Sequence, residues 1–81
     1  MTREEVLAVI KKHIKATLED VDVESIDPDR SMRDYDANSL DVVEIISGTM
    51  RDLRTKVPRE ELENVKSING LVDAFLRHMA P

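Results

Sequence analysis

Ser39 is the residue of this chain whose position most clearly suggests chemistry. Its context, DANSLDVVE, places it where a helical pattern begins. The free N–H groups and positive dipole end of such a helix favour an attached phosphate, so an exposed hydroxyl here is suited to carry a phosphodiester. The alternative is purely structural. Ser and Asn are both good N-cap residues, and Ser39 or Asn38 could simply cap the helix.

Other residues that could act in catalysis form weaker patterns. Ser39 lacks the G-x-S-x-G elbow of serine hydrolases, and no base stands near it in the sequence. His13 falls on the edge of an apolar helical face, which predicts a partly buried packing residue. His78 falls on a polar face and is predicted to be solvated. We therefore assign no catalytic residue and do not expect an enzyme.

The stretch DPDRSMRDYDAN offers a possible calcium loop, with Asp27, Asp29 and Ser31 at its first, third and fifth positions. An EF-hand also needs Gly at the sixth position and a bidentate Glu at the twelfth. This chain has Met32 and Asn38 there. We therefore do not expect an EF-hand and assign no metal site, although a weak cation site in this acidic loop stays open.

Composition limits the classes of function. A chain of 81 residues is expected to form a single domain over residues 1–81. Its net charge of −5 argues against nucleic-acid binding and is compatible with a basic protein partner. The absence of Cys excludes disulfides and thiolate chemistry from the chain itself. No apolar run reaches the ~18 residues of a membrane span, and MTREEV is not a signal peptide, so we expect a cytoplasmic protein that binds no membrane.

Three segments have helical periodicity and an aliphatic face, which predicts an all-α fold. The first runs from about Thr2 to Leu18, and Thr2 and Glu5 have the spacing of a capping box. An Asp-rich connection of roughly twenty residues follows, a length that is often functional or contains a short helical turn. We expect four of its apolar residues to hold it against the core: Val21, Val23, Ile26 and Met32.

The second helix is predicted from about Ser39 to Leu53, and the last from a Ser67 cap to Met79. Between them a short helical turn is expected, with Pro58 at its first helical position. The last helix gathers its apolar residues on one face: Ile68, Leu71, Val72, Phe75, Leu76 and Met79. These elements predict a small four-helix bundle, with three main helices, one short helix and a long first loop.

The second helix has two apolar faces. Its core stripe follows helical spacing and contains Val42, Ile45, Ile46, Thr49 and Leu53. Almost opposite lie Leu40, Val43, Glu44 and Ser47, and Arg51 and Arg54 continue the same line. Scattered exposed apolar residues are normal, and basic residues at a helix end are favoured by its dipole. The functional interpretation is a docking surface, an apolar patch with a charged rim one turn from Ser39.

DANSLDVVE, followed by KVP and REELENVKSINGLVDAF, resembles the acyl carrier proteins over essentially the whole chain. The resemblance implies that Ser39 carries 4′-phosphopantetheine, added from coenzyme A by a phosphopantetheinyl transferase, and that the arm bears acyl groups as thioesters. It assigns Leu40, Val43 and Glu44 to the partner-binding surface and gives Asp41 a part in partner recognition. The expected acyl shelter is formed by Val57, Leu62 and Val65. Expected partners include acyltransferase or ketosynthase-type enzymes, and the carrier is expected to be a monomer.

The chain departs from the usual pattern of this family at several positions. Asn38 replaces the Asp before the serine, and Asp36 replaces a common Gly. Arg51, Arg54 and Lys56 stand where carriers of bacterial fatty acid synthesis are acidic, and this change of sign should reject partners built for an acidic face. We therefore expect a free-standing carrier from a specialised pathway, such as polyketide biosynthesis.

Within that group, ANSLDVVEIIS and the basic stretch after it are similar to the donor carriers of β-branching cassettes. Those carriers hand acetyl groups to a hydroxymethylglutaryl-synthase-like enzyme, which makes acetyl the expected cargo here. Three alternatives stay open at this point: a carrier of fatty acid synthesis, a peptidyl carrier, and a helical interaction module in which Ser39 is never modified.

Overall fold

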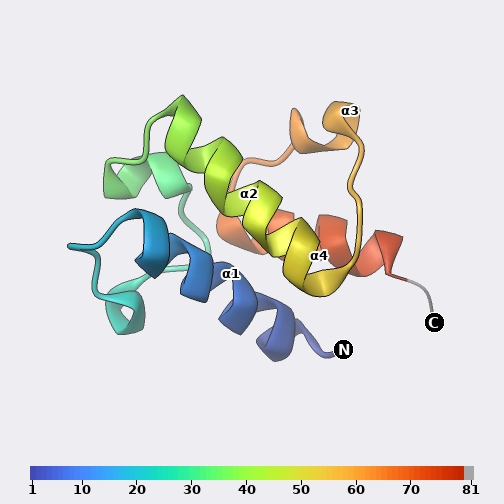
Figure 1. The fold of residues 1–81 in the computed structure, drawn as a ribbon, viewed down its shortest axis with the longest axis horizontal. Coiled ribbons are helices and arrows are strands. Elements are labelled where there is room, and N and C mark those ends of the chain that lie inside the picture. Colours follow the sequence, from blue (N-terminus) through green and yellow to red (C-terminus); the bar gives the residue numbers. More distant parts are fainter. Residues whose placement is uncertain (80–81) are drawn as a thin grey trace.

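The computed structural model describes residues 1–79 and has the predicted all-α fold. Three main helices are α1 (Arg3–Thr17), α2 (Ser39–Leu53) and α4 (Ile68–His78), and α3 (Arg59–Leu62) is a single short turn. The long first loop contains two short 3-10 helices, η1 (Val23–Ser25) and η2 (Met32–Tyr35). Helices α1 and α2 lie side by side and run in opposite directions (Figure 1). Helix α4 passes behind α2 in this view and contacts α1, and α3 stands apart from α1.

The helix ends follow the capping signals in the sequence. Thr2 Oγ1 accepts a hydrogen bond from the Glu5 N–H at 3.2 Å, and the Glu5 carboxylate accepts one from the Thr2 N–H at 2.9 Å, so the predicted capping box is confirmed. Ser67 Oγ caps α4 by accepting from the Gly70 N–H at 3.0 Å. Pro58 is the N-cap of α3 and not its first helical residue, because its ψ of 147° is extended. That prediction was wrong by one position.

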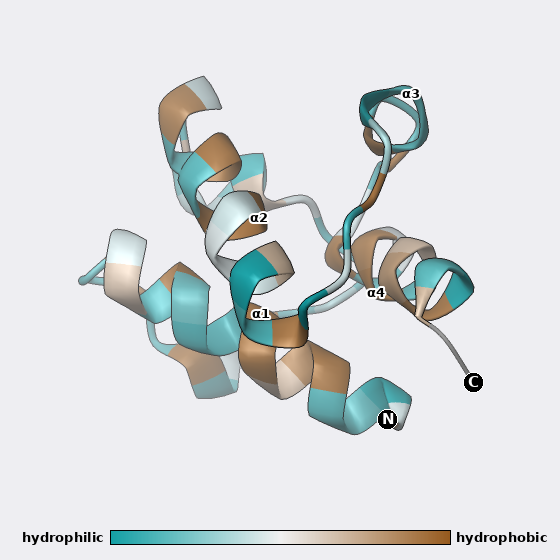
Figure 2. Cartoon of the chain, turned by 45° about the vertical axis from the view of Figure 1, so that its right-hand side comes forward, coloured by the Kyte–Doolittle hydropathy of each residue, from teal (hydrophilic) through white to brown (hydrophobic). Residues whose placement is uncertain are grey.

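The core is aliphatic and is formed where α1, α2 and α4 meet. Hydrophobic stretches mark these three helices in Figure 2. The largest fully buried side chains are Val6, Ile10, Ile14, Ile45, Thr49, Ile68, Leu71, Val72 and Phe75. The first loop is held as predicted, since Ile26 and Met32 are buried and Val21 and Val23 are half-buried. In addition, the Asp27 N–H donates to the Tyr35 hydroxyl at 2.6 Å, which ties the loop to η2.

A glycine brings α1 and α2 close together. Gly48 is buried, and a Cβ placed on it would lie 2.4 Å from His13 Nδ1, so the imidazole ring occupies the space that a side chain would need. His13 Nε2 lies 2.7 Å from an Asp52 carboxylate oxygen, and Lys12 Nζ lies 3.1 Å from the same oxygen. These bonds, the His13 bond first, lower the pKa of Asp52. The prediction that His13 is a partly buried packing residue is confirmed.

A second charged cluster connects α3 to the end of α4. Glu61 accepts a hydrogen bond from Arg77 Nε at 2.6 Å and also contacts His78 Nε2. The His78 and Arg77 bonds lower the pKa of Glu61. His78 is exposed, as predicted, but the sequence did not predict its contact with a carboxylate 17 residues away in the chain. Within residues 1–79, no helix is long and apolar enough to cross a membrane.

Candidate functional site

Ser39 is the first residue of α2, and its neighbour Asn38 caps the helix. Asn38 Oδ1 accepts a hydrogen bond from the Asp41 N–H at 2.8 Å, and the Asp41 carboxylate accepts one from the Asn38 N–H at 3.1 Å. The alternative that Ser39 itself is the cap was therefore wrong. Ser39 is exposed, and its hydroxyl takes no part in ending the helix. This leaves a free hydroxyl at the N-terminus of a helix of 15 residues.

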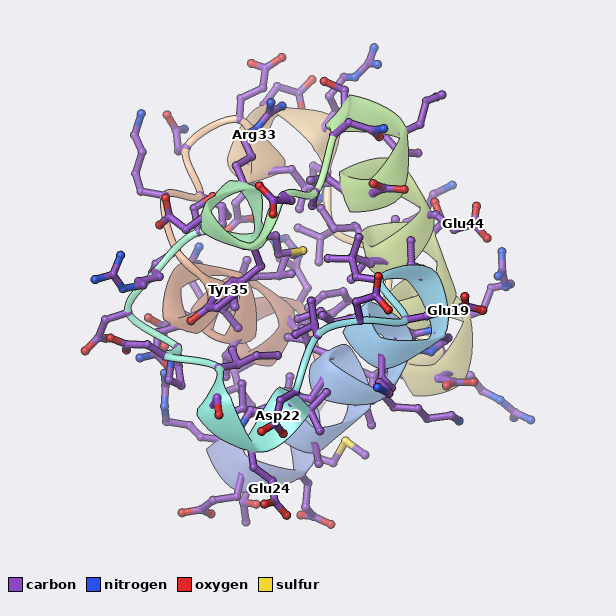
Figure 3. All side chains as sticks on the ribbon, turned by 90° about the vertical axis from the view of Figure 1, so that its left-hand side faces the viewer. Glu19, Asp22, Glu24, Arg33, Tyr35 and Glu44 are labelled. Carbon is purple, nitrogen blue, oxygen red and sulfur yellow. The ribbon has the colours of Figure 1, made fainter. Side chains whose placement is uncertain are left out.

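A cation stands next to this hydroxyl. Arg33 Nη2 donates a hydrogen bond to Ser39 Oγ at 3.2 Å. Figure 3 shows Arg33 rising from η2 on the side of the molecule where α2 begins. Sequence reasoning missed Arg33, because only the folded loop brings a residue six positions earlier back to the serine. The one sequence feature that pointed to Arg33 was its position as a basic residue in the acidic stretch DRSMRDYDAN.

The turn between η2 and α2 contains a residue in a left-handed conformation. Asp36 ends η2 with a φ of 67°, in the left-handed region that favours glycine. Asp tolerates this conformation better than most residues, because its short side chain is polar and unbranched at Cβ. Asp36 therefore makes this left-handed turn without a glycine.

Two hollows lie between α2 and the segments around α3. The first, of about 300 Å³, has a lining of mixed polarity that includes Met32, Arg33, Val42, Ile46, Leu62, Glu63, Val65 and Lys66. The second, of about 520 Å³, is lined by residues that include Val43, Ile46, Met50, Val57, Pro58 and Leu62. Of the three residues expected to shelter an acyl chain, Leu62 lines both hollows, Val65 the first and Val57 the second. The structure therefore distributes them around two adjacent hollows.

The outer face of α2 exposes the predicted apolar patch. Leu40 is 81% exposed and Val43 is 60% exposed, whereas Ile45 on the opposite face is fully buried. Glu44 is exposed beside them, and Ser47 is half-buried. This confirms that α2 has a core stripe and a separate outer face. Asp41 is half-buried and serves the cap, so its role in partner recognition stays a prediction.

The basic residues at the end of α2 are arranged differently from the prediction. The helix ends at Leu53, and Arg54 follows with a φ of 51°, so Arg54 does not continue the helical line from Leu40 to Arg51. Arg51, Arg54 and Lys56 instead line one shallow hollow of about 350 Å³ together with Ser47 and Met50. Within residues 1–79, none of these three cations forms an ion pair.

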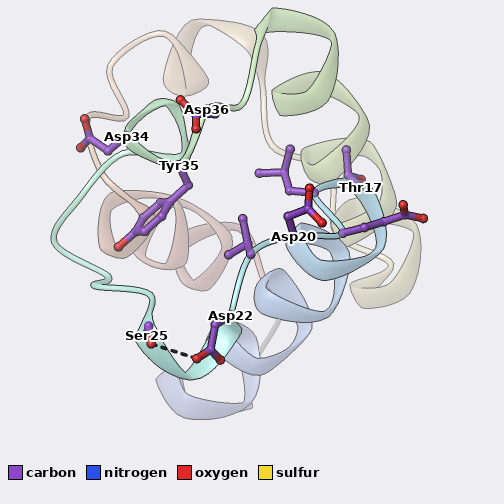
Figure 4. Close-up of a pocket in the computed structure, with 10 residues that line it drawn as sticks. Thr17, Asp20, Asp22, Ser25, Asp34, Tyr35 and Asp36 are labelled. Atoms are coloured by element: carbon purple, nitrogen blue, oxygen red, sulfur yellow. Dashed lines mark hydrogen bonds between the residues drawn. The ribbon is translucent and has the colours of Figure 1, made fainter.

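Another hollow, of about 640 Å³, lies over the first loop and has an acidic rim. The carboxylates of Asp20, Asp22, Asp34 and Asp36 stand around it and do not converge on a common point (Figure 4). Asp22 caps η1 by accepting a hydrogen bond from the Glu24 N–H, and its carboxylate also accepts one from the Ser25 hydroxyl. In the part of the chain that the structure describes, no three His, Asp or Glu residues are grouped to hold a metal ion.

Comparison with known proteins identifies the family of the chain. Residues 8–75 match the family model for the phosphopantetheine attachment site. The polyketide biosynthesis acyl-carrier-protein AcpK of Bacillus subtilis (strain 168) is 32% identical over 75 residues, which cover 93% of this chain and 92% of that protein. The acyl carrier protein of Rubrobacter xylanophilus is 35% identical over 79 residues and covers 96% of both chains.

A solved structure is also similar over almost the whole chain. It is that of the hydroxymethylglutaryl (HMG) synthase of the curacin biosynthetic pathway in complex with an acetyl donor acyl carrier protein. The TM-score is 0.82 with 33% sequence identity, covering 93% of this chain and 96% of that one. The family model alone spans well over half of the sequence. The chain therefore belongs to the acyl carrier proteins, the family whose members take 4′-phosphopantetheine as their prosthetic group.

Proposed function

We propose that Ser39 is the attachment residue and that this carrier bears acyl groups as thioesters, which it delivers to enzymes of a polyketide or similar specialised pathway. The observation that carries the proposal is the exposed Ser39 hydroxyl at the first position of α2, released from capping by Asn38. Membership of the family identifies the attached group as 4′-phosphopantetheine, and Ser39 is exposed at a helix N-terminus where such a group can be attached.

The residues around Ser39 fit a phosphodiester. The hydroxyl lies at a helix N-terminus, and Arg33 Nη2 is 3.2 Å from it. Arg33 also lines a hollow whose wall has both polar and apolar residues. In the attachment reaction the Ser39 oxygen bonds to the phosphorus of coenzyme A nearest the pantetheine. The bond from that phosphorus to the adenosine bisphosphate leaving group breaks, and the hydroxyl proton passes to a base of the transferase. The attached group supplies the thiol that a chain without Cys lacks.

Intact mass spectrometry tests the attachment. The protein is incubated with coenzyme A and a broad-specificity phosphopantetheinyl transferase, beside Ser39→Ala and the control Ser25→Ala, an exposed serine on η1. We expect a gain of one phosphopantetheine in the wild type and in Ser25→Ala, and none in Ser39→Ala. A wild type that gains no mass, with a transferase proven active on another carrier, would refute the proposal and favour an unmodified interaction module.

The partner surface proposed for this carrier is the outer face of α2. Leu40 and Val43 supply an exposed apolar centre, and Asp41, Glu44, Ser47, Arg51 and Arg54 surround it. A carrier must bind and release successive enzymes, so a small contact area with electrostatic steering suits its work. The unpaired cations at the end of α2 favour a partner that is acidic at the matching point.

Acetyl is the proposed cargo, and an HMG-synthase-like enzyme is the proposed acceptor. The support is the similarity to the acetyl donor carrier of the curacin HMG synthase, together with the basic cluster of Arg51, Arg54 and Lys56. Carriage of longer chains for fatty acid synthesis is the competing possibility. It would call for partners whose basic surfaces these three cations repel.

Acetyl transfer distinguishes the two pathways. The acetylated carrier is offered in parallel to an HMG-synthase-like enzyme and to a fatty acid ketosynthase, and loss of acetyl is followed by intact mass. We expect transfer to the first enzyme to be faster, and the double variant Arg51→Glu, Arg54→Glu to lose that preference. Arg30→Glu, an exposed change in the first loop, is the control. Equal transfer by wild type and double variant would refute the role of the basic cluster.

A further inference from the structure

The guanidinium of Arg33 carries a charge that the rest of the described chain does not neutralise. Its side chain is bonded to the Ser39 hydroxyl, and it forms no ion pair within residues 1–79. Nearby carboxylates are engaged elsewhere. Asp34 accepts from the Ser31 N–H at 3.1 Å as part of the η2 cap, and Asp41 accepts from the Asn38 N–H. A cation is thus directed at a neutral hydroxyl in the unmodified protein.

The residues flanking the serine strengthen this local positive field. Asn38, the residue just before Ser39, is neutral and places no negative charge next to the serine. The first-turn N–H groups of α2 add the partial positive charge of a helix N-terminus. Lys66 lines the same hollow as Arg33, together with one carboxylate, that of Glu63. These features form a setting for a single negative charge on Ser39.

We propose that Arg33 is the positioning residue for the phosphodiester on Ser39 and fixes the root of the arm beside the hollow lined by Met32, Val42, Ile46, Leu62 and Val65. The inference rests on the proposed attachment at Ser39 and adds what holds the attached group. A guanidinium suits this role because its fork of N–H donors binds two phosphate oxygens at once. In the modified protein, Arg33 therefore donates hydrogen bonds to the phosphate oxygens in place of its single hydrogen bond to the Ser39 hydroxyl.

The hollow lined by Arg33 determines where the arm can lie once its phosphate is held. Its volume of about 300 Å³ is at the lower end of the range for small-molecule sites, roughly 300–1,000 Å³. The wall of the hollow is mixed, and a phosphate held by Arg33 at its edge directs the start of the arm toward the apolar residues of that wall and not into solvent. Because Arg33 is exposed, its attraction for the phosphate is screened by salt, with a Debye length of about 10 Å at 0.1 M.

NMR of the modified protein tests the inference without any partner enzyme. Wild type, Arg33→Gln and Arg33→Lys are converted to the phosphopantetheine form, with Arg30→Gln as the matched control. Arg30 is an exposed arginine of the same loop, whose Nε lies 3.8 Å from Asp27 and which does not contact Ser39. The measured quantities are the phosphorus shift and line width, the guanidinium N–H shifts of Arg33, and contacts between the arm and Met32 or Val65.

We expect the Arg33 N–H resonances to move when the wild type is modified. In Arg33→Gln the phosphorus line should narrow and shift toward that of free phosphopantetheine, and the arm contacts to Val65 should weaken. Arg33→Lys should be intermediate, Arg30→Gln should match the wild type, and added salt should move the wild-type spectrum toward that of Arg33→Gln.

Two different failures can be told apart. If the wild type gains no mass at Ser39, the attachment proposal fails and the inference fails with it. If Ser39 is modified but the phosphorus spectra of wild type and Arg33→Gln are the same, the carrier function stands and the positioning role of Arg33 is overturned. Circular dichroism of each variant before modification verifies that the fold is unchanged.

Discussion

At the start of α2, capping and chemistry are assigned to different residues. Asn38 and Asp41 satisfy each other's backbone N–H groups, and the Ser39 hydroxyl between them takes no part in capping. An N-cap of this kind is worth about 1 kcal/mol, so a serine that had to cap the helix would lose that stabilisation on modification. Giving the cap to Asn38 separates the stability of the helix from the chemistry of the serine.

The exposed patch on α2 gives a prediction about single residues. Val43→Asp should change the free energy of unfolding by no more than about 0.5 kcal/mol, because Val43 is 60% exposed. Acyl transfer to a partner should fall about tenfold in kcat/KM, which corresponds to ~1.4 kcal/mol. Urea denaturation and transfer kinetics measure the two effects. The contrast is Ile45→Ala on the buried face, which should cost roughly 2–5 kcal/mol of stability.

A large loss of stability in Val43→Asp would place Val43 in the core and contradict the two-faced description of α2. Unchanged transfer would remove Val43 from the partner surface. The same pair of measurements on Leu40→Ala, at 81% exposure, verifies whether the patch extends to the first turn of the helix.

What the sequence could predict at this scale depended on how local the interaction is. The Thr2–Glu5 capping box and the Ser67 cap lie within one turn, and both were predicted correctly. The choice between Ser39 and Asn38 as cap stayed open, because both residue types serve and only backbone geometry selects one. Arg33 beside Ser39 and Glu61 beside His78 depend on loop conformation and tertiary packing, which periodicity does not contain.

At the scale of elements, α1 and α2 meet through a ring placed over a glycine. Gly48 lacks the Cβ that would collide with His13, and the ring in turn bonds Asp52 one turn further along α2. Gly in a helix interior normally costs roughly 0.5–1 kcal/mol relative to Ala, so its presence here has a packing reason.

Because of this contact, replacing each of the two glycines by alanine should change the stability of the fold in opposite directions. Gly48→Ala should destabilise the fold by about 1–3 kcal/mol despite the better helix propensity, because the new methyl group displaces His13. Gly70→Ala should stabilise it by up to about 1 kcal/mol, since the added Cβ meets nothing nearer than 3.5 Å. Thermal unfolding of both variants measures the difference. A stabilised Gly48→Ala would show that the fold does not depend on the packing of His13 over Gly48.

The extents of the main helices followed from the sequence because hydrophobic spacing and caps agree over many residues. The end of α2 was less predictable. A helical wheel continues to Arg54, whereas the chain leaves the helix after Leu53 through a left-handed residue. Pro58 was misplaced by one position for a related reason. Its fixed φ of −60° suits both an N-cap and a first helical residue, and only ψ separates them.

At the scale of the whole molecule, charge is distributed unevenly. The net charge is −5, and acidic residues gather around the first loop, while Arg51, Arg54 and Lys56 form a basic region at the far end of α2. A partner that approaches along α2 therefore meets a potential that changes sign along the helix. Such a gradient favours one orientation of docking and rejects partners with the opposite arrangement.

Two charged clusters hold neighbouring helices together, and each is centred on one carboxylate. Asp52 joins α2 to His13 and Lys12 of α1, and Glu61 joins α3 to His78 and Arg77 of α4. The pKa values of Asp52 and Glu61 are both lowered from their ordinary values of 3.8 and 4.5. Asp52 and Glu61 therefore bind a proton less tightly in the folded state than in the unfolded state.

The stability of the whole fold should consequently decrease in acid. Because the unfolded chain binds more protons as pH falls through this range, the contribution of each carboxylate is fully present above its unfolded pKa. It is lost as pH falls through its lower folded pKa. Urea midpoints from neutral pH to about pH 3 measure this for the wild type, Asp52→Asn and Glu61→Gln, with Asp20→Asn as an exposed control.

Each test variant should be less stable than the wild type at neutral pH, and the difference should shrink toward zero as the wild-type carboxylates become protonated. Asp20→Asn should follow the wild-type curve, because its carboxylate forms no ion pair within residues 1–79. A difference between Glu61→Gln and wild type that stayed constant down to about pH 3 would mean that the charge on Glu61 does not hold α3 to α4.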